Sequence, residues 1–203
     1  MNMPIVDVSG ENLEKAARIV RGGGLVIYPT DTVYGLGCDP LNSSAVQRLL
    51  AVKGREDKPL PILVGNIQNA AALAELPTAA RRVAERYWPG PLTLVLKSKV
   101  KIQGVKLDTV GLRVPKHKVA LKLIRLCGGC LIGTSANISG RPPPLTAEEA
   151  ADQLGDKVDL ILDGGKAPLG LSSTVLDLSG DQPKVLRAGP IDAKELLRIL
   201  DEK

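Results

Sequence analysis

The chain has 203 residues, of which 44 % are hydrophobic and 24 % charged, as in an ordinary soluble globular protein. Its net charge of +5 favours anionic partners such as nucleotide phosphates or RNA. One Trp, three Tyr and no Phe are too few for a protein that stacks the bases of single strands. No run of residues approaches the ~18 apolar positions of a membrane span, and no signal-peptide pattern opens the chain. We therefore expect a cytoplasmic protein without a membrane partner.

Helices and strands alternate along the chain. The apolar spacing predicts a helix from the cap Ser9 to Gly22, a buried strand at Leu25–Tyr28, a helix from Asn42 or Ser43 to Gly54, and an edge strand at Leu60–Val64 that Pro61 interrupts. Further on it predicts helices at 66–76, 80–87, 120–127, after the capping pair Thr146 and Glu149, and from Pro190, with strands at 92–96, 109–114, 131–134, 159–162, 173–178 and 184–187. This order indicates a single α/β domain over residues 1–203 with a mixed sheet.

The stretch GGGLVIYPTDTVYGLGCDP, from Gly22 to Pro40, combines a buried strand with a polar rim. Pro29 ends the strand because it has no N–H to donate. Four residues whose side chains can form hydrogen bonds follow, Thr30, Asp31, Thr32 and Tyr34, and then Gly35 and Gly37. Such a strand end is typical of the edge of a small-molecule site, although a polar loop with turn glycines would have the same pattern.

Cations and small polar residues are the other candidates for chemistry. Lys53, Arg55 and Lys58 surround a helix-ending glycine, where they could hold a polyphosphate or simply suit the helix dipole. Arg113 lies within a strand, so it must be paired or line a cavity, and its planar fork suits a carboxylate. The loop that carries Ser135 and Asn137 could bring backbone N–H groups to a phosphate, or be an ordinary Asx turn.

Cysteine and histidine are scarce, and neither points to a metal site. Cys127 and Cys130 have the spacing of a redox pair or of half a zinc site, with Cys38 and His117 as the remaining candidates for ligands. Because Cys127 closes a helix, the dipole disfavours its thiolate, and a structural role is favoured. His117 is expected to be solvated. No P-loop and no dinucleotide fingerprint is present.

Seven segments together resemble the YrdC-like family, the threonylcarbamoyl-AMP synthases. They occur in the family's order and cover nearly the whole chain: YPTDTVYGLG, KGREDKPL, YWPGPLTLVL, VGLRVP, TSANISG, SSTVLDL and VLRAG. The resemblance implies a twisted, open mixed sheet wrapped by helices around a concave basic surface.

The resemblance also implies roles for individual residues. The catalytic tetrad around the nucleotide would be Lys53, Arg55, Ser135 and Asn137. L-Threonine would be bound by Thr32, Arg113, Gly133 and Ser173, and ATP by Arg55, Lys58, Thr109, Ser135, Pro143 and Arg187. One departure is Leu63, which stands where many relatives have a histidine near the threonine.

The implied reaction combines L-threonine, bicarbonate or CO2 and ATP into threonylcarbamoyl-AMP and releases pyrophosphate. Mg²⁺ would accompany ATP, with no metal bound by the protein itself. The product would pass to a downstream threonylcarbamoyl transferase complex that modifies tRNA beside the anticodon, and weak binding of tRNA or double-stranded RNA is expected. Three alternatives remain open at this point: an RNA-binding module without turnover, an inactive paralogue, and the related domain of hydrogenase-maturation carbamoyltransferases.

Overall fold

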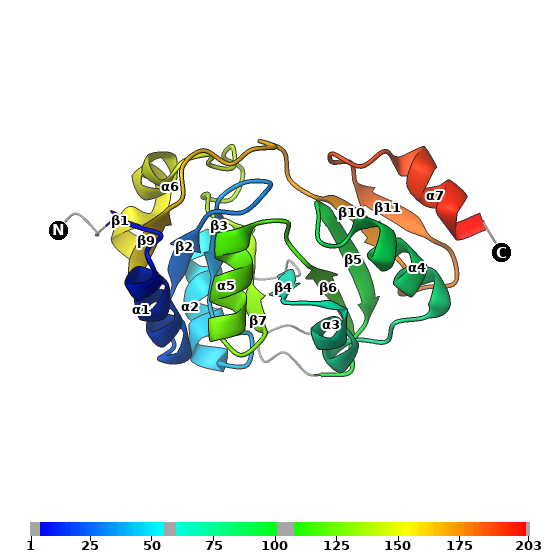
Figure 1. The fold of residues 1–203 in the computed structure, drawn as a ribbon, viewed down its shortest axis with the longest axis horizontal. Coiled ribbons are helices and arrows are strands. Elements are labelled where there is room, and N and C mark those ends of the chain that lie inside the picture. The colour runs from blue at the N-terminus through cyan, green and yellow to red at the C-terminus, as the bar shows by residue number, and fades with distance from the viewer. Residues whose placement is uncertain (1–4, 55–59, 101–107, 202–203) are drawn as a thin grey trace.

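The computed structural model describes residues 5–54, 60–100 and 108–201 (Figure 1). These residues form helices α1 (Gly10–Arg21), α2 (Ser43–Lys53), α3 (Ile67–Leu73), α4 (Thr78–Tyr87), α5 (Lys118–Leu126), α6 (Ala147–Leu154) and α7 (Ala193–Asp201), and a 3-10 turn at Gly155–Lys157. The strands are β1 (Ile5–Asp7), β2 (Val26–Tyr28), β3 (Gly35–Gly37), β4 (Ile62–Val64), β5 (Leu92–Lys97), β6 (Thr109–Arg113), β7 (Cys130–Ile132), β8 (Thr134–Ser135), β9 (Leu160–Asp163), β10 (Thr174–Asp177) and β11 (Lys184–Arg187).

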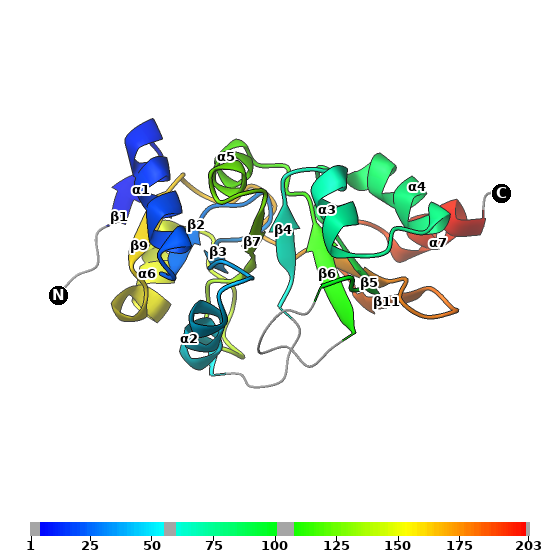
Figure 2. The ribbon, with the colours of Figure 1, turned by 90° about the horizontal axis from the view of Figure 1, so that it is seen from below.

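The described strands form two mixed sheets that lie one after the other along the long axis of the molecule (Figures 1 and 2). Sheet A has the order β1-β9-β2-β3-β8, and sheet B has the order β11-β10-β5-β6-β4-β7. Helices α1, α2 and α6 surround sheet A at the N-terminal end, whereas α3, α4 and α7 lie beside sheet B (Figure 1). The predicted α/β class is confirmed, with the strands divided between two sheets.

Aliphatic side chains form the core, in three clusters. One fills sheet A beneath α2 and α6, one lies between sheet B and helices α3, α4 and α7, and one lies between α1, α5 and strands β2 and β9. No helix among the described residues is both long and apolar enough to cross a membrane.

Local capping signals located the first helices correctly. Ser9 caps α1, with its hydroxyl accepting from the N–H of Asn12 at 3.3 Å. Asn42 caps α2 in the same way, through the N–H of Ala45 at 3.1 Å. Gly54 ends α2 with φ = 61°, a left-handed conformation that glycine adopts without strain.

Three predicted features are wrong. Strand β4 is internal, between β6 and β7. Pro61 precedes the strand, so its missing N–H removes no hydrogen bond from the ladder and does not restrict β4 to an edge. The last helix begins at Ala193, where Asp192 accepts from the N–H groups of Lys194 and Glu195, and not at Pro190. His117 is half-buried, and its Nδ1 accepts from the N–H of Ala120 at the start of α5.

The strand expected at 131–134 is divided at Gly133, and this division joins the two sheets. Strand β7 ends at Ile132 in sheet B, and β8 begins at Thr134 in sheet A. A Cβ at position 133 would overlap the side chain of Leu63 on β4, so the crossing requires glycine. The chain therefore passes from one sheet to the other beside the residues that prove to line a cavity.

Candidate functional site

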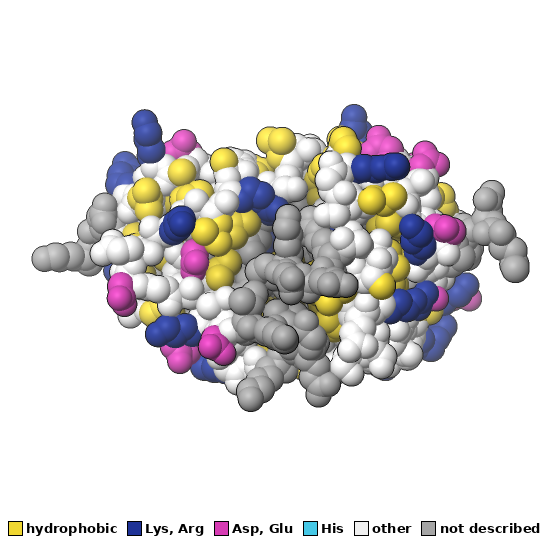
Figure 3. All heavy atoms as spheres, turned by 180° about the vertical axis from the view of Figure 1, so that it is seen from behind, with side chains coloured by type: hydrophobic (Ala, Val, Ile, Leu, Met, Phe, Trp, Pro, Cys, Tyr) yellow, Lys and Arg dark blue, Asp and Glu magenta, His cyan; other side chains and the backbone are white. Residues whose placement is uncertain are grey.

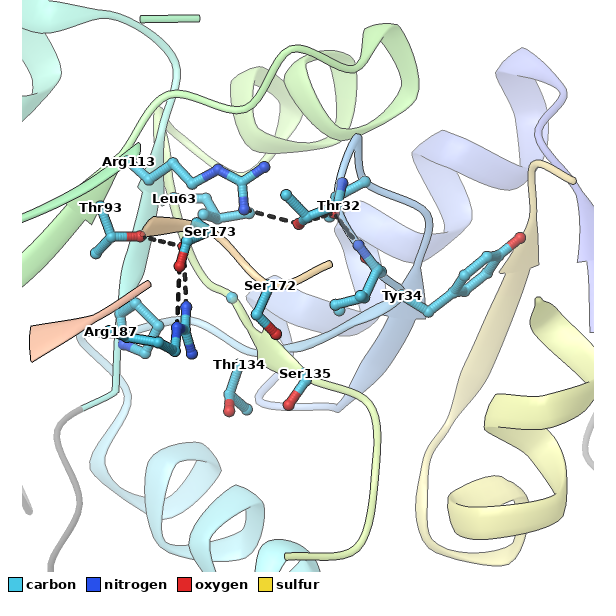
Figure 4. Close-up of a pocket in the computed structure, with 15 residues that line it drawn as sticks. Thr32, Tyr34, Leu63, Thr93, Arg113, Thr134, Ser135, Ser172, Ser173 and Arg187 are labelled. Carbon is cyan, nitrogen blue, oxygen red and sulfur yellow. Dashed lines mark hydrogen bonds between the residues drawn. The ribbon is translucent and has the colours of Figure 1, made fainter. Parts of the chain in front are cut away.

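A cavity of about 140 Å³ lies where the two sheets meet (Figure 4). Sheet A contributes the segment between β2 and β3 together with β8, and sheet B contributes the ends of β4, β5, β6 and β11 and the approach to β10. The lining is mostly polar: Thr30, Thr32, Val33, Tyr34, Gly35, Pro61, Leu63, Thr93, Arg113, Gly133, Thr134, Ser135, Ser172, Ser173 and Arg187.

Arg113 is the buried cation of the cavity, with only 5 % of its surface exposed. Its Nε donates to the carbonyl of Gly90 at 2.9 Å, Nη1 donates to Thr32 Oγ1 at 2.9 Å, and Nη2 forms an ion pair with Asp31 at 2.5 Å. Burial lowers the pKa of Arg113, and the Asp31 carboxylate opposes this shift. A buried guanidinium needs such a partner, because an unpaired buried charge is strongly destabilising.

The segment after β2 brings Thr30, Asp31 and Thr32 to this arginine. All three are almost fully buried. Thr30 Oγ1 donates to the carbonyl of Val33 at 2.6 Å and lies 3.0 Å from Thr32 Oγ1. The polar rim expected from the sequence is therefore part of a closed turn. Thr32 faces the cavity, whereas the Tyr34 hydroxyl points away from it and donates to the Gly165 carbonyl at 2.7 Å (Figure 4).

Arg187 and Ser173 form the opposite wall, on sheet B. Arg187 donates from Nε to the Ser173 carbonyl at 2.9 Å and from Nη2 to Ser173 Oγ at 3.0 Å. Thr93 Oγ1 lies 2.8 Å from the same serine oxygen. The pairing of β10 with β11 shifts its register between Val175, which pairs with Arg187, and Leu176, which pairs with Val185. Such a bulge redirects the side chains next to it. Burial and the neighbouring Arg113 both lower the pKa of Arg187.

Lys53 lies behind the cavity, where it holds the loop that carries Ser135 and Asn137. Its side chain is completely buried, as the apolar stripe of α2 predicts. Its ammonium donates to the carbonyls of Ser135 and Asn137, each at 2.6 Å, and to Asn137 Oδ1 at 2.9 Å. Ser135 Oγ donates to the same Asn137 Oδ1 at 2.6 Å. Three residues of the predicted tetrad thus form one hydrogen-bonded unit, in which Ser135 lines the cavity.

Leu63 gives the cavity an apolar wall together with Pro61 and Val33. It is the position at which the resemblance implies a histidine in many family members, and its side chain packs against Gly133. No histidine, cysteine or carboxylate belongs to the described lining, and the described residues contain no cluster of three or more such groups that could hold a metal ion.

Most of the predicted substrate residues meet at this cavity: Thr32, Arg113, Gly133, Ser135, Ser173 and Arg187. Lys53 and Asn137 support it from behind. Thr109 begins β6, at the opposite end of that strand from Arg113, and Pro143 lies in the loop after β8, so neither belongs to the described lining. Arg55 and Lys58 lie outside the described residues.

Sequence reasoning missed two partners that complete the site. Asp31 pairs with Arg113, and Thr93 contacts Ser173. A buried arginine within a strand requires a counter-ion, so the position of Arg113 already indicated that a carboxylate such as that of Asp31 lies nearby. Nothing in the local pattern identifies Thr93, because its partner lies 80 positions away in the chain.

Charged side chains on the surface are mixed in sign. On the face shown in Figure 3, lysines and arginines alternate with aspartates and glutamates over the part of the surface that is described. The described part of that face therefore has no continuous basic patch.

The three cysteines are free thiols, with Cys38 buried and Cys127 and Cys130 half-buried. Cys127 caps the C-terminal end of α5, the end that disfavours a thiolate. Burial raises the pKa of Cys127 to about 12 and also raises that of Cys130. These features agree with the predicted structural role.

Replacing both Cys127 and Cys130 by serine should change mainly the thermal stability and should leave any turnover at the cavity within a few fold of wild type. The reason is that neither thiol lines the described cavity and burial keeps both protonated. Steady-state turnover and thermal melting of the double variant measure this. Lost turnover with unchanged melting, or stoichiometric zinc released on denaturation of the wild type, would contradict it.

Comparison with known proteins shows which family the chain is similar to. Residues 18–189 match the Sua5/YciO/YrdC family model, whose description is telomere recombination. The threonylcarbamoyl-AMP synthase of Pyrococcus abyssi is 44 % identical over 192 residues, which cover 92 % of this chain and 56 % of that protein. A Mycobacterium tuberculosis protein that carries the same name provisionally is 43 % identical, with 91 % of this chain and 87 % of its own length covered.

Solved structures show the same fold. The crystal structure of P. abyssi Sua5 complexed with L-threonine is 40 % identical, with a TM-score of 0.90 over 99 % of this chain and 60 % of that one. Escherichia coli YciO is 29 % identical, with a TM-score of 0.84 over 93 % of this chain and 94 % of its own. The chain thus spans about three fifths of the Pyrococcus protein. Because the family model covers most of the sequence, the chain belongs to the Sua5/YciO/YrdC family.

Proposed function

We propose that this chain is a threonylcarbamoyl-AMP synthase, a nucleotidyltransferase that condenses L-threonine, bicarbonate or CO2 and ATP and releases pyrophosphate. The observation that carries the proposal is the cavity in which a buried, anchored arginine faces threonine and serine hydroxyls. This cavity occurs in a family whose P. abyssi member has been crystallised with L-threonine.

The amino acid fits the part of the cavity around Arg113. Three of the five N–H groups of Arg113 are taken up by the described residues, which leaves one donor on each terminal nitrogen for a carboxylate. Ser173 lies on the opposite wall, and Leu63 supplies an apolar surface for the methyl group of threonine.

The nucleotide fits the side of the cavity formed by Ser135 and Arg187. Arg187 brings a positive charge to this side, and the Ser135 loop is fixed from behind by Lys53. Arg55 and Lys58 would add cations at the phosphates, while Thr109 and Pro143 would contact parts of ATP beyond the described cavity. Because the described lining has no carboxylate, Mg²⁺ would be bound mainly by the phosphates of ATP, whose charge it would neutralise.

The chemistry needs positioning and no covalent intermediate with the protein. The threonine amine takes up CO2 and loses a proton, which gives a carbamate. A carbamate oxygen then attacks the α-phosphorus of ATP, and pyrophosphate leaves. Arginines and hydroxyls that are fixed before the substrates bind suit this reaction, because they stabilise charge without having to reorganise.

The product would pass to a downstream threonylcarbamoyl transferase complex for modification of adenosine beside the tRNA anticodon. Weak binding of tRNA or double-stranded RNA, and a cytoplasmic location, stay predictions. The mixed charges on the described part of the face in Figure 3 favour RNA binding that is weak.

Pyrophosphate release from ATP should require both L-threonine and bicarbonate. Each substrate is omitted in turn, and serine and glycine are offered in place of threonine, while pyrophosphate is measured with a coupled assay. An RNA-binding module without enzymatic activity would release none. Equal ATP consumption with serine, glycine or no amino acid would show that the substrate assignment is wrong.

A further inference from the structure

Gly189 lies directly against the peptide bond that joins Ser173 to Thr174. A Cβ atom at position 189 would lie 2.4 Å from Thr174 N, 2.6 Å from Ser173 C and 2.6 Å from Ser172 O. All three are backbone atoms, which no rotation of a side chain can move aside. Gly189 does not have a positive φ, so the close approach, and not the backbone conformation, is what requires glycine here.

The same peptide holds the guanidinium of Arg187. The Ser173 carbonyl belongs to this peptide and accepts from Arg187 Nε at 2.9 Å, while Arg187 Nη2 donates to Ser173 Oγ at 3.0 Å (Figure 4). Among the described residues, both hydrogen bonds that fix Arg187 therefore end on Ser173. A shift of the peptide would move both acceptors at once.

The turn after β11, which contains Gly189, is anchored on both sides. Thr174 Oγ1 donates to the Ile191 carbonyl and accepts from the Ile191 N–H, each at 3.0 Å. Helix α7 begins two residues later, and its apolar face is buried against sheet B. The two residues before Ser173, in contrast, are half-buried or exposed. Added bulk at position 189 would therefore displace the approach to β10 rather than the turn.

We propose that Gly189 is a positioning residue, which keeps Arg187 against Ser173 and so directs its charge into the cavity. The inference rests on the proposed function, in which Arg187 stands on the nucleotide side. Ordinary Cβ contacts begin at 3.4 Å and the nearest atom would be at 2.4 Å, so alanine would require a shift of about 1 Å. The motif VLRAG thus combines a cation with the glycine that orients it.

Two variants and a matched control test this proposal. Gly189→Ala adds one methyl group at the contact, and Thr174→Val removes the hydroxyl that holds the turn. Gly180→Ala adds the same methyl group in the β10–β11 hairpin, where a Cβ would meet no described atom within 4 Å. Thermal melting first shows that each variant is folded. NMR then measures hydrogen exchange of the Arg187 Nε–H group, assigned by its absence in Arg187→Lys, and steady-state kinetics measure kcat/KM for ATP.

In wild type, the Arg187 Nε–H group should exchange slowly, because it donates to the Ser173 carbonyl. Gly189→Ala should speed this exchange about 5- to 10-fold, as expected for the loss of one hydrogen bond. It should also lower kcat/KM for ATP about 10- to 100-fold, the range expected for a displacement of about 1 Å. Thr174→Val should change both quantities in the same direction. Thr174→Ser, which keeps the hydroxyl, and Gly180→Ala should leave both within about twofold of wild type.

A Gly189→Ala protein that loses kcat/KM for ATP while its Arg187 Nε–H group still exchanges slowly would overturn the inference, because the loss would then arise elsewhere. An unchanged kcat/KM would overturn it as well. If Gly189→Ala does not fold, Thr174→Val is decisive, and slow exchange in that variant refutes the proposal. A wild-type protein that turns over no ATP would instead refute the proposed function, and the exchange measurement would still test how Arg187 is held.

Discussion

Replacing Lys53 by methionine should lower the rate of pyrophosphate release by about two orders of magnitude and should also lower the melting temperature. The ammonium of Lys53 donates to the carbonyls of Ser135 and Asn137 and to Asn137 Oδ1. Methionine keeps the unbranched stem but leaves these buried acceptors without that donor, at roughly 1–3 kcal/mol for an unsatisfied group. The Ser135 loop would then shift, and a displacement of about 1 Å in a positioning element can cost 10²-fold in rate.

The structure changes the expected stability of this variant. A lysine directed only at phosphates would leave the melting temperature unchanged or higher when its charge is removed. Arg48→Met provides the control, because Arg48 lies on the same helix and forms an exposed ion pair with Asp159 at 2.6 Å. Such a pair typically contributes about 0–1 kcal/mol to stability. Turnover should be retained, because Arg48 does not belong to the described cavity lining. A Lys53→Met protein that kept most of its turnover would refute the role of Lys53 in the site.

Replacing Arg113 by lysine should raise the KM for L-threonine by about 100-fold, while the KM for ATP changes by only a few fold. Lysine keeps the positive charge but lacks the planar fork, so it cannot bond Gly90, Thr32 and Asp31 while still presenting two donors to a carboxylate. Steady-state kinetics with each substrate varied in turn separate the two KM values.

Arg125→Lys is the matched control for this variant, because Arg125 is exposed on α5 and the substitution conserves charge in the same way. Its KM for threonine should equal that of wild type. An Arg113→Lys protein with an unchanged KM for threonine would place the amino acid elsewhere. A parallel rise in both KM values would indicate a general loss of structure at the junction of the two sheets, and not a specific carboxylate contact.

Local sequence signals determined the boundaries of several elements and the direction of one critical side chain. Ser9 and Asn42 cap their helices, and Gly54 ends α2, because these residues satisfy or permit the backbone geometry of a helix end by themselves. The stripe of α2 likewise placed Lys53 among buried positions. The order of motifs along the chain indicated the family, which the comparisons confirmed.

The tertiary structure alone decided what these side chains contact. Lys53 meets the Ser135 loop across 82 positions, Arg113 meets Asp31 across 82, and Thr93 meets Ser173 across 80. No local periodicity reports such pairs, because residues this far apart in the chain become neighbours only through long-range packing. Thr93 and Ser173 meet through the pairing of β5 with β10 inside sheet B, whereas Arg113 and Asp31 meet across the junction of the two sheets. Strand pairing likewise makes β4 internal, since β4 pairs with β6 on one side and with β7 on the other. The sequence thus determined the residue types and the elements that carry them, whereas strand pairing over long distances decided which donor faces which acceptor.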